Sequence, residues 1–431
     1  MGKENRCMRQ PCRMVIAAAL FAWAAFPSSF GGIPIANAAG PIIDVEKEGD
    51  RRITIGVDLY KELGTSELGA PPGDILAFDL ELSGWFDPIR PGVMAPNGTA
   101  DWARKGAEVV AEMTAVPGGI SGRVRDAGTG NVLLEKTYAS SEGTLRRRIH
   151  HFADDIVQTL TGEKGMAGTQ IVCEWNSGKG KRVVRMDIDG SGMKEITGEG
   201  ALELSPRWSS DGSKVLYTSF SSGYPDVFLH DLKAGNRKRI AHYEGLNAFG
   251  DLHPNGDLLV LTMSSSGDPE VYTKDLSSGK IHRLTHHKAT DTSPVWSPDG
   301  SRIAFVSDRT GEPQVYVMNA DGSSPKQVTL RGNYNTAPEW SPDGTRIAYC
   351  ALRPDGFQIQ VVDLESGGVT TVTEGGGCED PCWSPDGRSI LYSRNAGGRT
   401  DLYVTDLSER RALRITRGSG KFTTPDWSPI P

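Results

Sequence analysis

The sequence predicts an α/β N-terminal domain followed by an all-β six-bladed β-propeller that the C-terminal strand closes. Three observations carry this prediction. A five-residue motif recurs through the second half of the chain, a preceding region has helix and strand patterns without the repeat, and a truncated motif ends the sequence. The 431 residues include 52 glycines and 26 prolines, an excess that favours a fold with many tight turns.

The repeat has the sequence Trp-Ser-Pro-Asp-Gly and occurs at residues 296–300, 340–344 and 383–387. Degenerate copies stand at 208–212 and 252–256, and a truncated copy stands at 427–429. The intervals from residue 208 are 44, 44, 44, 43 and 44 residues. Each unit contains four short strand patterns separated by turn residues, and a period of roughly 40–50 residues with this content is typical of propeller blades. We expect the repeated Trp side chains to pack between blades.

The two ends of the predicted propeller, 165–431, complement each other. The first set of strands starts near Thr169 and lacks the initial strand of the unit, whereas Thr424–Ser428 is an initial strand with nothing after it. The C-terminal strand should therefore complete the first blade, because closure removes an open sheet edge.

Residues 51–164 form the predicted α/β domain. Strand patterns cover 52–57, 108–116, 120–125 and 132–138, and a helical pattern covers 72–83. Apolar residues from Leu145 to Leu160 recur at spacings of 4, 3, 4 and 4 before Gly162. That spacing predicts an amphipathic helix that stops at the glycine.

Residues 1–38 have the organisation of a secretory signal peptide. Four basic residues precede the apolar run Met14–Phe26, and Ala36-Asn37-Ala38 offers small residues for cleavage. Cleavage removes four positive charges and one negative charge, which changes the net charge from −7 to −10. We expect an exported, soluble chain with no membrane insertion and no nucleic-acid partner, because a basic surplus is missing. Residues 39–50 are expected to be a flexible partner-binding segment.

The sequence contains no complete motif of the catalytic or cofactor-binding kinds that we considered. No Gly-x-Ser-x-Gly nucleophile elbow is present. Asp187–Gly192 imitates the start of a calcium loop, but Gly198 stands where that loop needs a bidentate Glu, so a hairpin turn is the better interpretation. We predict no catalytic residues, cofactors or metal. The spacing of Cys378 and Cys382 leaves open whether a turn between them allows a disulfide.

The best candidates for partner binding lie before each repeated Trp, in loops that should converge at one mouth of the propeller channel. They are polar and turn-prone, as binding loops often are. The candidate set is Glu203, Leu204, Asn247, Asp291, Thr292, Asn335, Thr336, Glu379, Asp380 and Thr423, with Ser205, Phe249 and Thr424 beside them. In the N-terminal segment, Ile42, Ile43 and Val45 are the candidates for ordering on a partner. We expect the mouth side chains to be solvated and to contribute little to the core.

The order of these parts resembles the TolB family, whose members have a signal peptide, a small α/β domain, six such blades and a terminal Trp-Ser-Pro. The stretches 79–86, 160–165 and 424–429 also resemble the family's versions. The resemblance implies a non-enzymatic, monomeric periplasmic adaptor of the Tol–Pal system. Its implied partners are a peptidoglycan-associated lipoprotein (Pal) at the propeller and TolA at the mature N-terminus, in support of outer-membrane integrity and constriction at cell division. Leu246 and Leu252 depart from the family pattern. The alternative is a secreted propeller related to peptidase propellers, with a ligand or substrate in its channel.

Overall fold

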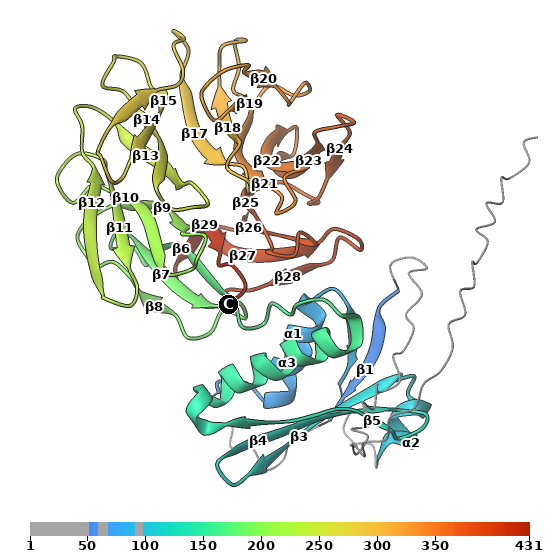
Figure 1. Cartoon of the computed structure of the whole chain (residues 1–431). Coiled ribbons are helices and arrows are strands. Elements are labelled where there is room, and N and C mark those ends of the chain that lie inside the picture. The colour runs from blue at the N-terminus through green and yellow to red at the C-terminus, as the bar shows by residue number, and fades with distance from the viewer. Residues whose placement is uncertain (1–50, 59–67, 91–97) are drawn as a thin grey trace, which may run out of the picture. The chain divides into compact units, whose positions relative to one another are not determined.

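The computed structural model describes residues 51–58, 68–90 and 98–431 (Figure 1). The predicted signal peptide at 1–38 and the segment 39–50, including Ile42, Ile43 and Val45, lie outside the described residues. Within the described ranges, no helix is long and apolar enough to span a membrane.

The first domain is a mixed five-stranded sheet with the strand order β2-β1-β3-β4-β5. Strand β1 pairs in parallel with both neighbours, and the other pairs are antiparallel. The strands are β1 (Ile53–Val57), β2 (Phe86–Ile89), β3 (Val109–Val116), β4 (Gly119–Asp126) and β5 (Val132–Ala139). The helices are α1 (Pro72–Leu82), α2 (Thr99–Arg104) and α3 (Leu145–Thr161), with a 3₁₀ turn η1 (Ser140–Glu142). The four predicted strands and two predicted helices are present, whereas β2 and α2 are too short to give a periodic signal.

The long helix α3 is held at both ends and packs on the sheet. Its N-cap residue Thr144 accepts a hydrogen bond from the Arg147 amide, and Gly162 ends it in the left-handed conformation, with φ 78°. Phe152 of α3 is fully buried and lies directly over Gly122 of β4. A Cβ atom at residue 122 would stand 2.6 Å from the Phe152 ring, so the glycine permits the close approach of helix and sheet.

The second part is a six-bladed propeller in which each blade is a four-stranded antiparallel sheet (Figure 1). Blade one consists of β29 (Lys421–Trp427), β6 (Gln170–Asn176), β7 (Lys181–Asp187) and β8 (Lys194–Glu195). Blade two is β9 (Glu203–Trp208), β10 (Lys214–Ser219), β11 (Asp226–Asp231) and β12 (Asn236–Ala241). Blade three is β13 (Asn247–Leu252), β14 (Leu258–Met263), β15 (Glu270–Asp275) and β16 (Ile281–Arg283).

The remaining three blades follow the same order along the chain. Blade four is β17 (Asp291–Trp296), β18 (Arg302–Ser307), β19 (Gln314–Asn319) and β20 (Lys326–Gln327). Blade five is β21 (Asn335–Trp340), β22 (Arg346–Arg353), β23 (Gly356–Asp363) and β24 (Val369–Thr371). Blade six is β25 (Cys378–Trp383), β26 (Ser389–Ala396), β27 (Arg399–Asp406) and β28 (Ala412–Arg414). We call the four strands of a blade A to D, from the channel outwards.

The predicted closure of the ring is confirmed. Strand β29 pairs antiparallel with β6, with Trp427 opposite Ile171. The Trp427 indole N–H donates to the Thr169 hydroxyl at 2.8 Å. The last strand therefore supplies the innermost strand of blade one.

The repeated motif forms the hairpin between strands A and B. In blade four the Ser297 hydroxyl donates to Asp299 Oδ1 at 2.6 Å and accepts from the Arg302 amide at 2.9 Å. Gly300 takes φ 71°, which the turn requires. The calcium-like segment at Asp187 is likewise a turn, in which the Gly190 amide donates to the Asp187 carbonyl. The Trp-Ser-Pro-Asp-Gly motif thus has a structural role, because its side chains stabilise the turn between strands A and B.

The four cysteines in the described part of the chain are buried free thiols, which answers the question left open for Cys378 and Cys382. Both lie on β25, and their sulfurs face different neighbours. The Cys378 thiol lies 3.9 Å from the Gly375 carbonyl, whereas the Cys382 thiol lies 3.5 Å from Asp426 Oδ1. The strand continues through Glu379-Asp380-Pro381, so the turn that a disulfide would need is not formed.

Candidate functional site

The mouth of the channel is built from one irregularity that occurs in all six blades. In each strand A the pairing register with strand B shifts, which marks a β-bulge. The bulge places one non-glycine residue per blade at φ between 44° and 55°, namely Ser205, Phe249, Ser293, Ala337, Asp380 and Thr424. Proline follows it in five blades and Gly250 in the sixth. We call these six residues the bulge ring.

The bulge ring and the residues after it line a cavity of about 160 Å³. Sites for small molecules usually measure roughly 300–1,000 Å³, so this cavity is small for a substrate. Its size suits one or two side chains of a partner.

All ten predicted mouth residues lie on strand A and not in the loops before it, because strand A begins earlier than the repeat suggests. Glu203, Asn247, Asp291 and Asn335 are the first residues of their strands and are at most 2% exposed. Asp291 accepts two hydrogen bonds from Arg309, at 2.9 and 3.1 Å, and the Asn335 amide donates to Gln314 at 2.7 Å. The expectation that these side chains are solvated and do little for the core is therefore wrong for these four.

The other predicted mouth residues keep some exposure. Leu204, Thr292, Thr336, Asp380 and Thr423 are half-buried, and Glu379 is exposed. Thr423 donates to the buried Glu174 at 2.9 Å. Burial and the nearby Glu174 carboxylate raise the pKa of Asp380 to about 6. The mouth is less acidic than the sequence suggests, since only Glu379 of the four predicted carboxylates is exposed.

Deeper in the channel lies a second ring that sequence analysis missed. It consists of the residue before the last residue of each strand A, which is Arg207, Asp251, Val295, Glu339, Cys382 and Asp426. These residues join neighbouring blades. Asp426 accepts from the Trp208 amide at 2.6 Å, and Asp251 accepts from the Trp296 amide at 2.8 Å. We call these six residues the inner ring. They recur with the same 44-residue period as the Trp motif, so the sequence contains a signal for them at the position before each motif.

The inner ring contains one guanidinium group, that of Arg207, and three carboxyl groups, those of Asp251, Glu339 and Asp426. Arg207 Nη1 lies 2.5 Å from Glu339 and 3.3 Å from Asp426. Burial, only partly offset by Arg207, raises the pKa of Glu339 to about 7 and that of Asp251 to about 6. It raises the pKa of Asp426 as well. The carboxyl groups of this ring therefore bind protons more readily than exposed ones.

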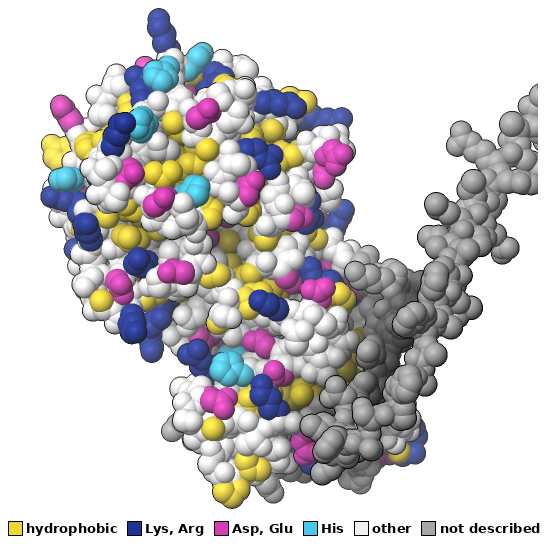
Figure 2. Space-filling view, in the orientation of Figure 1, with side chains coloured by type: hydrophobic (Ala, Val, Ile, Leu, Met, Phe, Trp, Pro, Cys, Tyr) yellow, Lys and Arg dark blue, Asp and Glu magenta, His cyan; other side chains and the backbone are white. Residues whose placement is uncertain are grey.

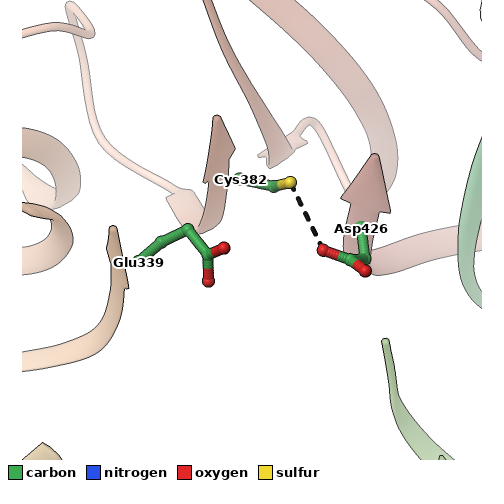
Figure 3. A group of neighbouring side chains, drawn as sticks. All are labelled: Glu339, Cys382 and Asp426. Atoms are coloured by element: carbon green, nitrogen blue, oxygen red, sulfur yellow. Dashed lines mark hydrogen bonds between the residues drawn. The ribbon is translucent and has the colours of Figure 1, made fainter. Parts of the chain in front are cut away.

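Glu339, Cys382 and Asp426 also place three possible metal-ligand atoms within 4.8 Å of one another (Figure 3). The geometry alone would accommodate a cation. However, Arg207 already contacts both carboxylates of this group, and burial raises the pKa of the Cys382 thiol well above its usual value. A thiol that holds its proton and carboxylates already paired with a guanidinium make a poor metal site.

The repeated Trp side chains are buried and tie the blades together, as predicted. The indole N–H of Trp208 donates to the Asp426 carbonyl, that of Trp340 to the Val295 carbonyl, and that of Trp383 to the Glu339 carbonyl. Each bond crosses from one blade to the preceding blade. The indole rings of these Trp residues therefore do not form a surface on which a ligand could stack.

Comparisons with known proteins agree with this architecture. Residues 157–431 match the family described as TolB beta propeller domain, and residues 41–125 match the TolB amino-terminal domain. The chain is similar to the Tol-Pal system protein TolB of Polaromonas sp., with 34% identity over 218 residues, or 48% of this chain and 50% of the relative. It is similar to the protein TolB homolog of Chlorobium chlorochromatii, with 32% identity over 223 residues, or 48% and 51% of the two chains. The chain thus spans about half the length of the curated relatives it matches.

A solved structure agrees over a longer stretch. The crystal structure of TolB from Acinetobacter baumannii is 26% identical, covers 88% of this chain and 98% of its own, and superposes with a TM-score of 0.79. A chain of a nidogen/laminin complex shares only the propeller fold, at 10% identity and a TM-score of 0.52. With both family domains matched in order and the propeller matched through its closing strand, the chain belongs to the TolB family.

Proposed function

We propose that this chain is a non-enzymatic periplasmic adaptor of a Tol–Pal system, which binds a Pal-like lipoprotein at the channel mouth and TolA through residues 39–50. The observation that supports this most directly is the match to both TolB domains in one chain. Curated relatives carry the name Tol-Pal system protein. In this role the monomer would support outer-membrane integrity and envelope constriction at cell division.

The mouth supports a protein partner better than a small substrate. Its cavity of about 160 Å³ is small, and a ring of backbone bulges followed by prolines surrounds it. Proline lacks the amide donor that polar ligands often use. The alternative, a secreted propeller with a ligand or substrate in its channel, would need a larger space there.

Within the mouth we assign partner contact to the residues that keep exposed surface. Phe249 of blade three is 36% exposed and lies in the bulge ring, and Glu379 of blade six, three blades further round the mouth, is also exposed. Leu204, Thr292, Thr336, Asp380 and Thr423 offer further half-buried surface. An exposed aromatic ring and a carboxylate on the opposite side of the mouth suit a partner that presents an apolar side chain and, apart from it, a basic one. The buried Glu203, Asn247, Asp291 and Asn335 would instead support this surface from beneath.

Calorimetric titration with the soluble domain of a Pal-like lipoprotein tests the mouth. Phe249→Ala combined with Glu379→Lys should weaken binding at least tenfold, or about 1.4 kcal/mol, with an unchanged thermal melt. The matched control is Glu365→Lys, since Glu365 is an exposed carboxylate in a strand C–D hairpin at the opposite end of the blades. Unaltered affinity in the double variant, or an equal loss in the control, would place the binding surface elsewhere.

The N-terminal arm of the proposal has a separate test. A chain that starts at Arg51 lacks the apolar Ile42, Ile43 and Val45, which could pair with a partner's sheet edge. It should lose binding to the periplasmic domain of TolA and keep its affinity for the lipoprotein. Undiminished TolA binding by the shortened chain would remove residues 39–50 from the contact.

A further inference from the structure

Blade four contains an arginine held by its own chain in a complete guanidinium site. Arg309 donates to both oxygens of Asp291 and, at 2.8 Å, to the Ser307 hydroxyl. Its guanidinium lies 5.3 Å from the centre of the Phe305 ring and 4.8 Å from that of Tyr316. The side chain is only 17% exposed. A carboxylate and two aromatic rings thus enclose one cation.

Blade two repeats this arrangement without the arginine. The matching positions, two repeats earlier in the sequence, are Glu203 for Asp291, Tyr217 for Phe305, Phe228 for Tyr316 and Ser221 for Arg309. The ring pairs are alike: the Tyr217 and Phe228 centroids are 5.9 Å apart, and those of Phe305 and Tyr316 are 5.7 Å apart. Serine is much shorter than arginine, so the B–C loop of blade two supplies no cation to its carboxylate.

A cavity lies at this place in blade two. Its volume is about 470 Å³, and it is lined by the β8–β9 loop (196–201) and by Glu203, Ser221, His230 and Arg237. This volume is within the usual range of roughly 300–1,000 Å³ for ligand sites. We call it the blade-two cavity.

The cavity contains hydrogen-bond acceptors that have no partner within the part of the chain that is described. Glu203 is 2% exposed, and its Oε2 accepts no hydrogen bond. Nδ1 of His230 is also buried and without a hydrogen bond. Burial and the nearby Arg237 lower the pKa of His230, so its imidazole is neutral near pH 7. One nitrogen of a neutral imidazole can accept a hydrogen bond. A buried acceptor without a donor is costly, and an N–H group of a ligand would satisfy Glu203 Oε2.

Arg237 supplies only part of what Arg309 supplies in blade four. It lies 4.9 Å from the centre of the Phe228 ring, but its Nη1 is 3.9 Å from Glu203 Oε1, which is too long for a hydrogen bond. Its side chain is 43% exposed. The charged side chains that line the cavity are this arginine and two carboxylates, Glu203 and Glu199, the latter also 3.4 Å from Arg182. Since Glu199 has Arg182 beside it, the oxygen left for a cation is Oε2 of Glu203.

We propose that the blade-two cavity binds a guanidinium group, which donates to Glu203 Oε2 as Arg309 donates to Asp291 in blade four. The chemistry is that of an arginine side chain, carried either by a partner protein or by a small free molecule. The site is separate from the adaptor role proposed above and does not depend on it.

Titration with N-acetyl-L-arginine methylamide tests the proposal, with the citrulline analogue as a neutral probe of the same shape. The arginine probe should bind at least tenfold more tightly than the citrulline probe. Glu203→Gln should weaken binding at least tenfold. Ser221→Arg should abolish binding and keep or raise the melting temperature, because it rebuilds the blade-four arrangement. Equal binding of the two probes, or undiminished binding by Ser221→Arg, would overturn the proposal.

Blade four offers the matched internal control. Arg309→Ser opens the corresponding site and should lower the melting temperature. Millimolar methylguanidinium should restore part of this loss, so that it raises the melting temperature of the variant, which has two open sites, by more than that of the unaltered chain, which has the blade-two cavity alone. Lack of restoration would show that a carboxylate and ring pair of this kind does not take a free guanidinium, which would also overturn the proposal. If the arginine probe binds more than tenfold more tightly than methylguanidinium, the natural ligand is an arginine side chain of a partner protein. Equal affinities would support a small free ligand.

Discussion

Replacing Asp291 by Ala should destabilise the propeller strongly, although the residue stands near the channel mouth. Asp291 is fully buried and accepts two of the three hydrogen bonds that the Arg309 side chain donates. Breaking a buried ion pair from one side costs roughly 3–5 kcal/mol, because the remaining charge loses its partner. We expect about 3 kcal/mol, the lower end of that range, since Arg309 is 17% exposed and can turn partly towards water.

The expected change in melting temperature follows from the size of the domain. A propeller of roughly 265 residues has an unfolding entropy of about 0.56 kcal/mol/K, so a loss of about 3 kcal/mol lowers the melting temperature by about 5 °C. Differential scanning calorimetry measures this directly. Glu379→Ala is the control at an exposed carboxylate near the same mouth, and it should change stability by less than about 0.5 kcal/mol.

A double replacement separates the ion pair from simple packing. Asp291→Val with Arg309→Leu removes both charges, and it should cost less than Asp291→Ala alone, because replacing both partners of a buried pair is often close to neutral. If Asp291→Ala melts like the unaltered chain, the carboxylate is not the structural anchor described here. If the double variant is the less stable of the two, packing rather than the unpaired charge explains the loss.

Three further predictions concern closure, pH and thiols. Removing residues 421–431 takes away the innermost strand of blade one and exposes the edge of β6, so the truncated chain should lose its cooperative melt or aggregate, and a melt like that of the full chain would contradict the closure. Glu339 and Asp251, with pKa values raised from 4.5 to about 7 and from 3.8 to about 6, hold protons in the folded chain that the unfolded chain has released. Their contribution to stability is complete below about pH 4 and is lost as the pH rises through 6 to 7. The unfolding free energy of Glu339→Gln, measured by urea titration, should therefore fall less than that of the unaltered chain between about pH 5 and pH 8, and parallel curves would refute this. A chain without residues 1–38 should show four reactive thiols when denatured without reductant and almost none when native, because its cysteines are free and buried; two unreactive thiols in the denatured chain would reveal a disulfide.

The sequence was sufficient to predict the fold because each element leaves a local, periodic mark. The 44-residue period of the Trp motif gave the blades, and the unmatched strand at Trp427 gave the closure. Strands as short as β2, and a helix as short as α2, leave too little periodicity to be seen.

The site could be predicted only in part, because its geometry depends on the bulge in strand A. The bulge breaks the alternation between Glu203 and Trp208, so the pattern cannot tell that Glu203 begins the strand and points into the blade. The blade-two cavity needed the contacts as well. The exchange of Arg309 for Ser221 is visible in the aligned repeats, but only the structure shows that Oε2 of Glu203 is left without a hydrogen-bond partner.

The closing strand also determines when the protein can finish folding. The bond between Trp427 and Thr169 joins residues 258 positions apart, so the first blade to be synthesised is the last to be completed. A chain that is synthesised from its N-terminus must keep β6 without its inner neighbour until the residues of β29 have been added. Contacts between such distant residues slow folding, and a waiting sheet edge can pair with the wrong chain. The same strand that stabilises the finished ring therefore imposes a delay during which we expect the protein to depend on chaperones.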